Sequence, residues 1–290
     1  DGKDITSLPP YERPLNYMFQ SYALFPHLNV FKNISFGIQN QSLSRLDLQD
    51  EVLKIAKLLE LENILERNIK NLSGGQQQRI ALARCIIKKP KLLLLDEPLA
   101  ALDKKLRTQT QFELINLQKK IGITFIFVTH DQEEAMTLSD RLSIMHKGKI
   151  VETGTPIEIY EKPKNIYTAN FIGTANLFDL ELNDSGDIIF KDLDIKFETS
   201  FDLNSNSTCL IRPEKIDINF DHNKNLQVNQ CRGVIKEVAY LGSFTKYLVI
   251  NNNFKINVMH QNKILDKKSF LLIGDNVICS WHKNSIVMIN

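Results

Sequence analysis

Residues 72–84 read LSGGQQQRIALAR, and residues 92–98 read LLLLDEP. A Ser-Gly-Gly turn that opens a helix presents backbone N–H groups and a hydroxyl at the positive end of the helix dipole, which suits a phosphate group. An ordinary capped helix explains the same residues, because Ser73 would satisfy the first turn and the glycines would allow tight packing. The first stretch alone leaves both interpretations open.

Two acidic residues, Asp96 and Glu97, follow the four leucines directly. Sheets of α/β proteins bind ligands at the carboxyl ends of their strands. One acid can hold Mg²⁺, directly or through water, while the other polarises an attacking water molecule. The alternative is a pair of acids that only marks the exit from a strand.

Asp103 and His130 are the next polar residues of interest, and His130 comes just after the apolar run 124–128. A histidine at the end of a strand can donate to a phosphate oxygen, and its charge is tunable near neutral pH. Considered alone, a single histidine is more simply explained as a surface or core residue with satisfied hydrogen bonds than as a phosphate ligand.

The pattern up to about residue 172 alternates helices and strands. It predicts helices over 47–66 and 106–117, the latter with Asp103 as N-cap, and strands over 91–95, 124–128, 142–145 and 149–153. Continuous apolar strands of this kind indicate an α/β fold with a parallel sheet covered on both faces.

Short strands with Asn- and Gly-rich turns follow from about residue 173. They are predicted over 208–211, 234–240, 247–250, 254–259, 277–281 and 285–289. This spacing indicates a small all-β domain, with a barrel of the OB type as the expected architecture.

Composition excludes several classes of protein. The 290 residues suggest about two domains. The charge of 36 basic against 34 acidic residues gives no support for an electrostatic nucleic-acid binder. The four cysteines are far apart and form no CxxC pair, which fits a reduced cytosolic compartment. No apolar run is long enough to span a bilayer.

Taken in order, these motifs resemble those of the nucleotide-binding subunits of ABC transporters. Residues 72–76 resemble the family signature, 92–97 Walker B, 102–103 the D-loop and His130 the switch histidine, while FQSYALFPH over 19–27 resembles the Q-loop. The resemblance implies a P-loop-NTPase-like ABC ATPase domain over 1–172 with a helical subdomain at about 28–72. An OB-like accessory domain would follow over 173–290.

The resemblance also implies roles for individual residues. Glu97 would be the general base, His130 would contact the γ-phosphate, and Gln20 would sense Mg²⁺ or the attacking water. Asp96, together with Gln20, would support Mg²⁺. ATP would be contacted across a homodimer by the signature and the D-loop, through Ser73, Gly74, Gly75, Gln76 and Asp103.

Membership of this family implies partners and a location. The ATPase homodimer would bind two integral-membrane permease subunits, with a periplasmic or extracellular solute-binding protein, at the cytoplasmic face of the plasma (inner) membrane. Nucleic acid is not expected as a partner. Phe25, Leu28, Val30 and Phe31 could contact the permeases or belong to the core.

Several sequence segments most resemble those of the ATPases that serve importers of the polyamines spermidine and putrescine. These segments are residues 122–135, 139–141, 161–165 and 171–173, together with IRPE (211–214) and YLGS (240–243) in the accessory domain. Alternatives are an importer of another small solute such as a sugar, iron or sulfate, an inactive remnant, or an ABC ATPase that acts on nucleic acid.

One family motif is absent from these residues. A P-loop, Gly-x-x-x-x-Gly-Lys-Ser/Thr, cradles phosphates with its backbone and neutralises charge with its lysine, and no such match occurs. In the family the P-loop precedes the Q-loop, yet only 19 residues precede Gln20. We therefore expect that the N-terminal part of the domain is missing and that this chain alone is inactive.

Overall fold

The computed structural model describes residues 2–39, 43–100, 102–182, 184, 187–190, 195–199, 207–222, 225–252, 254–262 and 270–289. The chain forms two compact units, residues 1–139 and 140–290, and each is described by itself. The domain boundary expected after residue 172 remains a prediction, and the division by contacts comes earlier in the chain.

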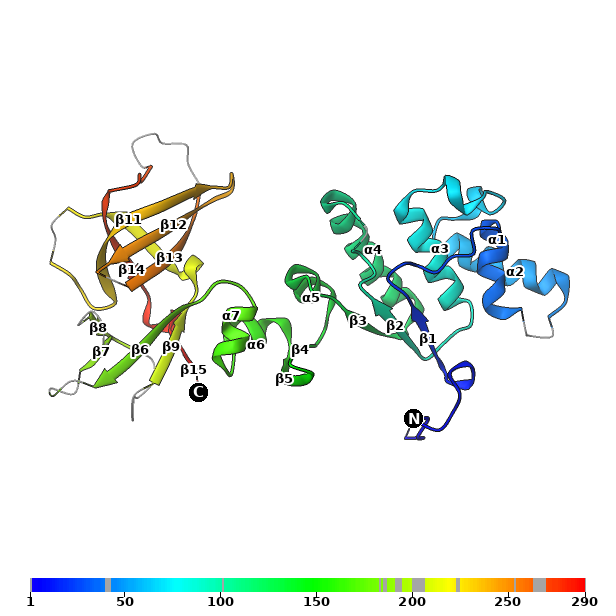
Figure 1. Ribbon diagram of the computed structural model, residues 1–290, viewed down its shortest axis with the longest axis horizontal. Coiled ribbons are helices and arrows are strands. Elements are labelled where there is room, and N and C mark those ends of the chain that lie inside the picture. The colour runs from blue at the N-terminus through cyan, green and yellow to red at the C-terminus, as the bar shows by residue number, and fades with distance from the viewer. Residues whose placement is uncertain are drawn as a thin grey trace. The chain divides into compact units, whose positions relative to one another are not determined.

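A parallel sheet organises the first unit, with strand order β1 (Leu15–Met18), β2 (Leu92–Asp96) and β3 (Thr124–Val128) (Figure 1). The strands expected over 91–95 and 124–128 are confirmed, whereas β1 was not predicted.

Only one face of this sheet is fully covered. Leu93 and Leu95 are buried in the core, whereas Ile126 and Val128 on the opposite face are 47% and 58% exposed. The expectation of a sheet covered on both faces is therefore wrong for β3. Its apolar residues alternate between a packed side and an open side, which a continuous apolar run does not reveal.

Five α-helices complete the described part of the first unit. They are α1 (Val30–Ser35), α2 (Arg45–Leu58), α3 (Gly74–Ile86), α4 (Lys104–Ile121) and α5 (Gln132–Leu138), with 3₁₀ turns η1 (Pro10–Glu12), η2 (Phe36–Ile38), η3 (Glu62–Ile64) and η4 (Ile69–Asn71). The helix expected over 106–117 is confirmed, and Asp103 caps it as predicted.

Helix α2 ends well before residue 66, where the amphipathic pattern placed its end. Glu60 has a φ of +57°, and the N–H of Leu61 donates to the carbonyl of Ala56 at 2.8 Å. This is the hydrogen-bond pattern of a Schellman cap, which closes a helix at a left-handed residue. Apolar residues beyond this cap, such as Leu61 and Ile64 of the following loop and 3₁₀ turn, are buried as well. Their spacing therefore resembles that of a longer α-helix.

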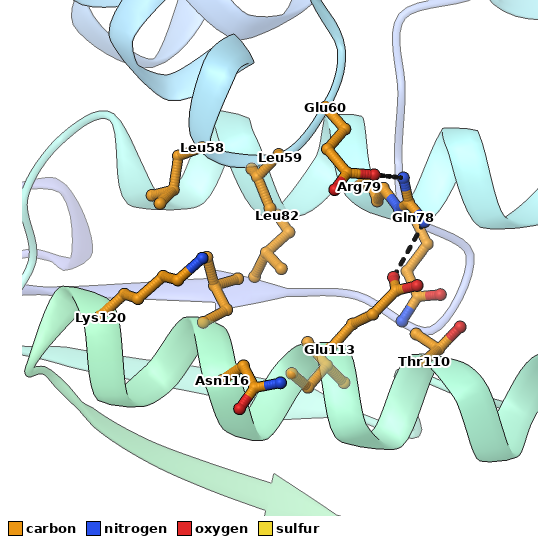
Figure 2. A pocket seen from close by; sticks show the side chains of 12 residues that line it. Leu58, Leu59, Glu60, Gln78, Arg79, Leu82, Thr110, Glu113, Asn116 and Lys120 are labelled. Atoms are coloured by element: carbon orange, nitrogen blue, oxygen red, sulfur yellow. Dashed lines mark hydrogen bonds and ion pairs between the residues drawn. The ribbon is translucent and has the colours of Figure 1, made fainter.

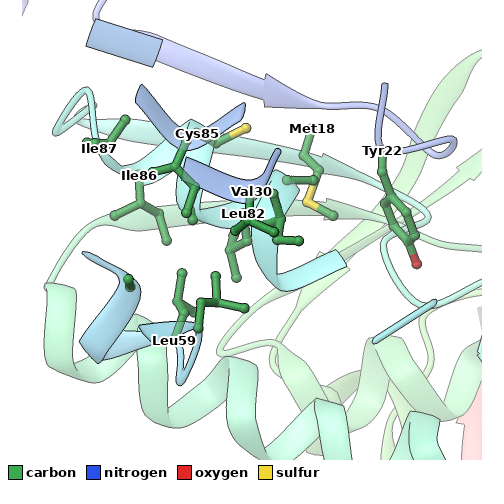
Figure 3. Packing of buried hydrophobic residues seen from close by; sticks show 14 of the residues in the cluster. Met18, Tyr22, Val30, Leu59, Leu82, Cys85, Ile86 and Ile87 are labelled. Carbon is green, nitrogen blue, oxygen red and sulfur yellow. The ribbon is translucent and has the colours of Figure 1, made fainter. Parts of the chain in front are cut away.

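Helix α3 lies in the centre of the core of the first unit (Figure 3). Leu82, Cys85 and Ile86 from α3 meet Met18 from β1 and Val30 from α1 in one cluster of buried side chains. Val30 is therefore a core residue, one of the two roles that its sequence left open. The other apolar residues of that group are partly buried.

The second unit begins with an antiparallel hairpin, β4 (Leu142–His146) and β5 (Lys149–Gly154), followed by α6 (Pro156–Glu161) and α7 (Ile166–Phe171). Lys147 and Gly148 have φ of +47° and +75°, as a type I′ turn requires at both central positions. Both predicted strands are confirmed.

Two five-stranded antiparallel sheets complete the second unit, in the orders β10-β14-β11-β12-β13 and β15-β9-β6-β7-β8. Their strands are β6 (Asn176–Leu182), β7 (Ile188–Phe190), β8 (Ile195–Phe197), β9 (Ser207–Ile211), β10 (Ile216–Phe220), β11 (Gln230–Tyr240), β12 (Phe244–Asn251), β13 (Phe254–Gln261), β14 (Asn276–Trp281) and β15 (Val287–Ile289), with η5 (Pro213–Lys215) and η6 (Lys283–Ser285). An aromatic core around Phe178 and Trp281, whose rings are 5.6 Å apart, holds the sheets together. The all-β character is confirmed, although β6, β7, β8 and β10 were not predicted.

Candidate functional site

Glu97 stands at the centre of a hydrogen-bonded chain of three residues from separate segments. The Nε2 of Gln20 donates to its Oε2 at 2.7 Å, and the Nδ1 of His130 lies 2.9 Å from its Oε1. The backbone N–H of Glu97 donates to the carbonyl of Val128 at 2.8 Å, which ties the ends of β2 and β3 together. The three residues expected to be catalytic are thus brought together at the carboxyl end of the sheet.

The backbone at Glu97 is strained. Its φ of +44° is left-handed, which is unfavourable for a side chain other than glycine, and Pro98 restricts it further. Such strain persists only where the surroundings enforce it, and it is concentrated at functional sites. Here the bond to Val128 and the two side-chain contacts of the carboxylate hold the residue in place.

The charge of His130 depends on its neighbour. The carboxylate of Glu97 raises the pKa of His130, first by its hydrogen bond and then by its charge, and Glu134 and Asp131 add smaller contributions. A protonated imidazole is a donor at both nitrogens. His130 can therefore donate to Glu97 through Nδ1 while Nε2, for which the described residues provide no partner, is left to donate elsewhere.

Asp96, the last residue of β2, accepts a hydrogen bond from the hydroxyl of Tyr17 at 2.6 Å, and this bond raises the pKa of Tyr17. The carboxylates of Asp96 and Glu97 and the amide of Gln20 offer oxygen ligands of the kind that Mg²⁺ prefers. Among the described residues, no group of three or more His, Cys, Asp or Glu side chains could hold a metal ion. The available ligands fit Mg²⁺ as it usually binds, with one or two carboxylates beside water and substrate phosphates.

The Ser73 turn forms the capped helix start that was one of its two interpretations. The Oγ of Ser73 accepts from the N–H of Gln76 at 3.3 Å, and the Oε1 of Gln76 accepts from the N–H of Ser73 at 3.0 Å. This reciprocal capping box satisfies two N–H groups at the start of α3.

Packing does not account for Gly74 and Gly75. A Cβ on either would meet only ordinary contacts, 3.8 Å from Leu102 and 3.5 Å from Leu106, and neither glycine has a positive φ. Tight packing was the structural explanation for these glycines, and the structure does not support it. Close approach of a ligand to the backbone is the other common reason for glycine at such a position.

Asp103 caps α4, accepting from the N–H of Leu106 at 3.0 Å. No hydrogen bond between described residues joins Asp103, or the segment 73–76, to the Gln20–Glu97–His130 chain. Hydrogen bonds therefore join the predicted catalytic residues to one another. The predicted nucleotide-binding residues lie at the starts of two helices and are not hydrogen-bonded to that group.

Sequence reasoning missed Arg84, which holds the segment after Gln20. Its guanidinium donates to the carbonyls of Tyr22 and Ala23 at 2.9 and 2.8 Å and lies 5.1 Å from the ring centroid of Phe25. Tyr22 and Ala23 are consecutive left-handed residues, with φ of +63° and +46°. An arginine in the last turn of a helix carries no local signal for such a distant contact.

Arg107 is a second residue that the sequence did not reveal. It donates to the carbonyl of Leu102 and to the carboxylate of Asp131, both at 3.1 Å. Asp131 in turn caps α5 by accepting from the N–H of Glu133. Arg107 thus ties the segment before Asp103 to the segment just after His130.

Comparison with known proteins identifies the class. The family described as ABC transporter matches residues 1–100, and the TOBE domain family matches residues 209–289. Relatives that align over most of the chain are ATP-binding proteins of importers, which agrees with the first family match. The chain therefore belongs to the ABC ATPase family. The resemblance of its motifs to that family is confirmed, as is a fold with an ABC ATPase part and a C-terminal all-β part.

Individual relatives can be named. The spermidine/putrescine import ATP-binding protein PotA of Clostridioides difficile is 44% identical over 91% of this chain and 74% of its own length. PotA of Trichormus variabilis is 45% identical over 90% of this chain and 71% of its own length. The putrescine transport ATP-binding protein PotG of Escherichia coli is 40% identical over all of this chain and 79% of its own length.

A solved structure of CbiO1 from Clostridium perfringens, part of the ABC transporter complex CbiONQ, has 31% identity and a TM-score of 0.48, covering 50% of this chain and 59% of that one. Over the described ranges, none of the helices is both long enough and apolar enough to cross a bilayer.

Proposed function

We propose that the chain is the ATP-hydrolysing subunit of an importer of polyamines, spermidine or putrescine. The hydrogen-bonded chain of Gln20, Glu97 and His130 carries the proposal for hydrolysis. The names of the relatives support polyamines as the solute. Another small solute, such as a sugar, iron or sulfate, is the alternative.

Glu97 would act as the general base. Bound Mg²⁺ and ATP supply the phosphoryl group and the neutralisation of its charge. Glu97 would take a proton from the attacking water, and the amide of Gln20, 2.7 Å away, would keep the carboxylate in one orientation. Asp96 and Gln20 would hold the metal, with the Tyr17 hydroxyl fixing Asp96.

His130 would contact the γ-phosphate through Nε2. The raised pKa of His130 supports this role, because the imidazolium can donate to Glu97 and to a phosphate oxygen at the same time. Neutral His130 has only one N–H, so it could serve only one of them. The switch histidine would thus depend on Glu97 for the protonation state that it needs.

The helix starts would complete the site of a partner copy. Ser73, Gly74, Gly75, Gln76 and Asp103 would contact ATP held by the other subunit of a head-to-tail homodimer. The lack of a packing reason for the two glycines supports close approach of a ligand there. The separation of these residues from the Gln20–Glu97–His130 chain in the hydrogen-bond pattern agrees with a site assembled from two copies.

The remaining partners would be two permease subunits and a periplasmic or extracellular solute-binding protein, at the cytoplasmic face of the plasma (inner) membrane. The segment 28–72 would bind the permeases. Its exposed apolar side chains Phe36, Leu46 and Leu53, which are 48%, 73% and 46% exposed, support a partner surface there. No partner role for nucleic acid is proposed.

Uptake by the cell that makes this protein tests the proposal. The chromosomal change Glu97→Gln would keep the shape of the site and remove the base, and we expect uptake of labelled spermidine and putrescine to fall roughly 100-fold or more. Glu237→Gln, at an exposed position of β11, is the matched control and should leave uptake unchanged.

Two other outcomes are informative. Loss of uptake of a sugar, sulfate or iron in Glu97→Gln, with polyamine uptake intact, would move the assignment to another solute. Unchanged uptake of every solute tested would refute a role in import.

A further inference from the structure

Tyr17 of β1 reaches a carboxylate at the end of the neighbouring strand. In the parallel register of β1 and β2, Tyr17 lies opposite Leu94, and Asp96 comes two residues further along β2 on the same face of the sheet. Two residues of a strand span about 6.6 Å, so only a long side chain covers that distance. The hydroxyl of Tyr17 donates to Oδ2 of Asp96 at 2.6 Å, which joins β1 to the residue expected to support the metal.

Core packing does not account for this contact. Tyr17 is 40% exposed, whereas Met18, on the other face of β1, is 2% exposed. The ring of Tyr17 packs edge-to-face against that of Phe19, with centroids 4.6 Å apart, which holds the ring in place without its hydroxyl. Because an exposed hydroxyl can bond to water at little cost, the fold does not need the bond to Asp96.

The hydroxyl orients Asp96 without neutralising its charge. Among the residues that the structure describes, Asp96 has this one side-chain hydrogen bond and no ion pair. Glu60 and Glu113 of the same unit differ, because both pair with Arg79, at 3.3 and 2.9 Å, as the dashed lines in Figure 2 show. An oriented carboxylate whose charge remains unpaired is suited to a metal ion, since ligating carboxylates are themselves held by hydrogen bonds.

The orientation decides how many oxygens Asp96 offers. While Oδ2 is held by Tyr17, Oδ1 is the oxygen left to face an ion. Ca²⁺ accepts both oxygens of one carboxylate in its flexible coordination shell. Mg²⁺ is smaller and demands nearly octahedral geometry, in which the two oxygens of one carboxylate lie too close together to fill two positions. Holding one oxygen away from the ion therefore costs Mg²⁺ little and deprives Ca²⁺ of a ligand.

We propose that Tyr17 is a positioning residue that limits Asp96 to one-oxygen coordination and thereby favours Mg²⁺ over Ca²⁺ at this site. The inference rests on the proposed role of Asp96 in supporting the metal, and it goes further by naming the residue that sets the preference for the ion. Removing the hydrogen-bond partner of a metal ligand typically changes metal affinity by about 10–100-fold, which gives the size of the effect to be measured.

Binding of the fluorescent nucleotide TNP-ATP tests the inference without measuring hydrolysis. The protein would be tagged at its chromosomal locus and purified with the subunits that accompany it. The Kd of TNP-ATP would be measured with Mg²⁺, with Ca²⁺ and with EDTA, so that the effect of each ion is its Kd relative to that in EDTA. Tyr17→Phe removes only the hydroxyl and keeps the contact with Phe19. We expect it to weaken the effect of Mg²⁺ about tenfold, to leave the effect of Ca²⁺ undiminished, and to leave the Kd in EDTA unchanged.

Two further variants make the result specific. Tyr11→Phe is the matched control, because Tyr11 is another exposed tyrosine of the first unit and its hydroxyl makes no hydrogen bond to a described residue. It should bind TNP-ATP as the unchanged protein does under all three conditions. Asp96→Asn should lose most of the effect of both ions, which tests the role of Asp96 separately.

The inference is overturned if the unchanged protein does not prefer Mg²⁺, or if Tyr17→Phe keeps the preference. It is overturned equally if Tyr17→Phe binds more weakly in EDTA as well, which would indicate a structural role. In each case, loss of the ion effects in Asp96→Asn would leave the proposed function standing. Ion effects that persist in Asp96→Asn would refute the metal role of Asp96 itself.

Discussion

The segment after Gln20 gives the sharpest prediction about how this site is held. Arg84 donates to two consecutive carbonyls, those of Tyr22 and Ala23, and both residues are left-handed. If these hydrogen bonds hold Ala23 in its unfavourable left-handed conformation, removing Arg84 should let Ala23 relax to a favourable one. A double-mutant cycle of Arg84→Met and Ala23→Gly measures that dependence directly.

The magnitudes follow from the contacts. Arg84→Met removes two hydrogen bonds from a charged donor and the contact with Phe25, so we expect a loss of about 3 kcal/mol. A left-handed residue other than glycine costs about 1–2 kcal/mol, and glycine adds about 0.5–1 kcal/mol of unfolded-state entropy. Ala23→Gly should therefore be slightly stabilising with Arg84 present and destabilising by about 0.5–1 kcal/mol without it, a coupling of about 1–2 kcal/mol.

Urea unfolding can be followed separately in the two units. The long helices α2, α3 and α4 belong to the first unit, so far-UV circular dichroism reports mainly on its unfolding. Trp281, the single tryptophan of the sequence, is buried in the second unit and serves as an internal control by fluorescence. Arg84→Lys keeps the charge but not the planar fork that reaches two carbonyls, so it should resemble Arg84→Met. Additive effects of Arg84→Met and Ala23→Gly would refute the reasoning.

Three further predictions concern other parts of the site. Glu97→Gln should lower the pKa of His130 toward about 6.5, measured by NMR titration. The raised pKa belongs to the folded state, so protonated His130 stabilises the fold fully at low pH. This stabilisation is lost as the pH rises above about 6.5 and through the folded-state pKa. An unchanged pKa of His130 in Glu97→Gln would contradict the contact between the two residues. Ser73→Ala should destabilise the first unit by about 1 kcal/mol in urea unfolding. The control Ser35→Ala should be nearly neutral, because the Ser35 side chain makes no capping hydrogen bond in the described structure. The purified 290-residue chain, which contains no P-loop, should show no magnesium-dependent ATP hydrolysis, and measurable turnover would disprove this.

Local chemistry made parts of the fold predictable. The strands over 91–95 and 124–128 are short apolar runs with clear ends, and Asp103 and Ser73 are good helix caps, so pattern and structure agree there. The end of α2 was not predictable in the same way. It depends on Glu60 adopting a left-handed conformation, for which glutamate gives no sequence signal.

Some residues of the candidate site were likewise predictable from the sequence, and others were not. Gln20, Glu97 and His130 could be proposed from their motifs, and the structure adds the contacts that join them. Arg84 and Arg107 could not, because they act on carbonyls and caps that are distant in sequence or hidden in loops. The strands β6, β7, β8 and β10 were not predicted, although Ile216–Phe220 alternates apolar and polar residues in step with its burial and carries a recognisable strand pattern.

The role of Glu97 as general base is the central claim, and hydrolysis by the assembled protein tests it most directly. The protein would be tagged at its chromosomal locus, purified with whatever subunits accompany it, and assayed for magnesium-dependent ATP hydrolysis. Glu97→Gln should lower the rate at saturating ATP by roughly 100-fold or more, while Glu237→Gln hydrolyses normally. Hydrolysis by Glu97→Gln at the wild-type rate would contradict the account.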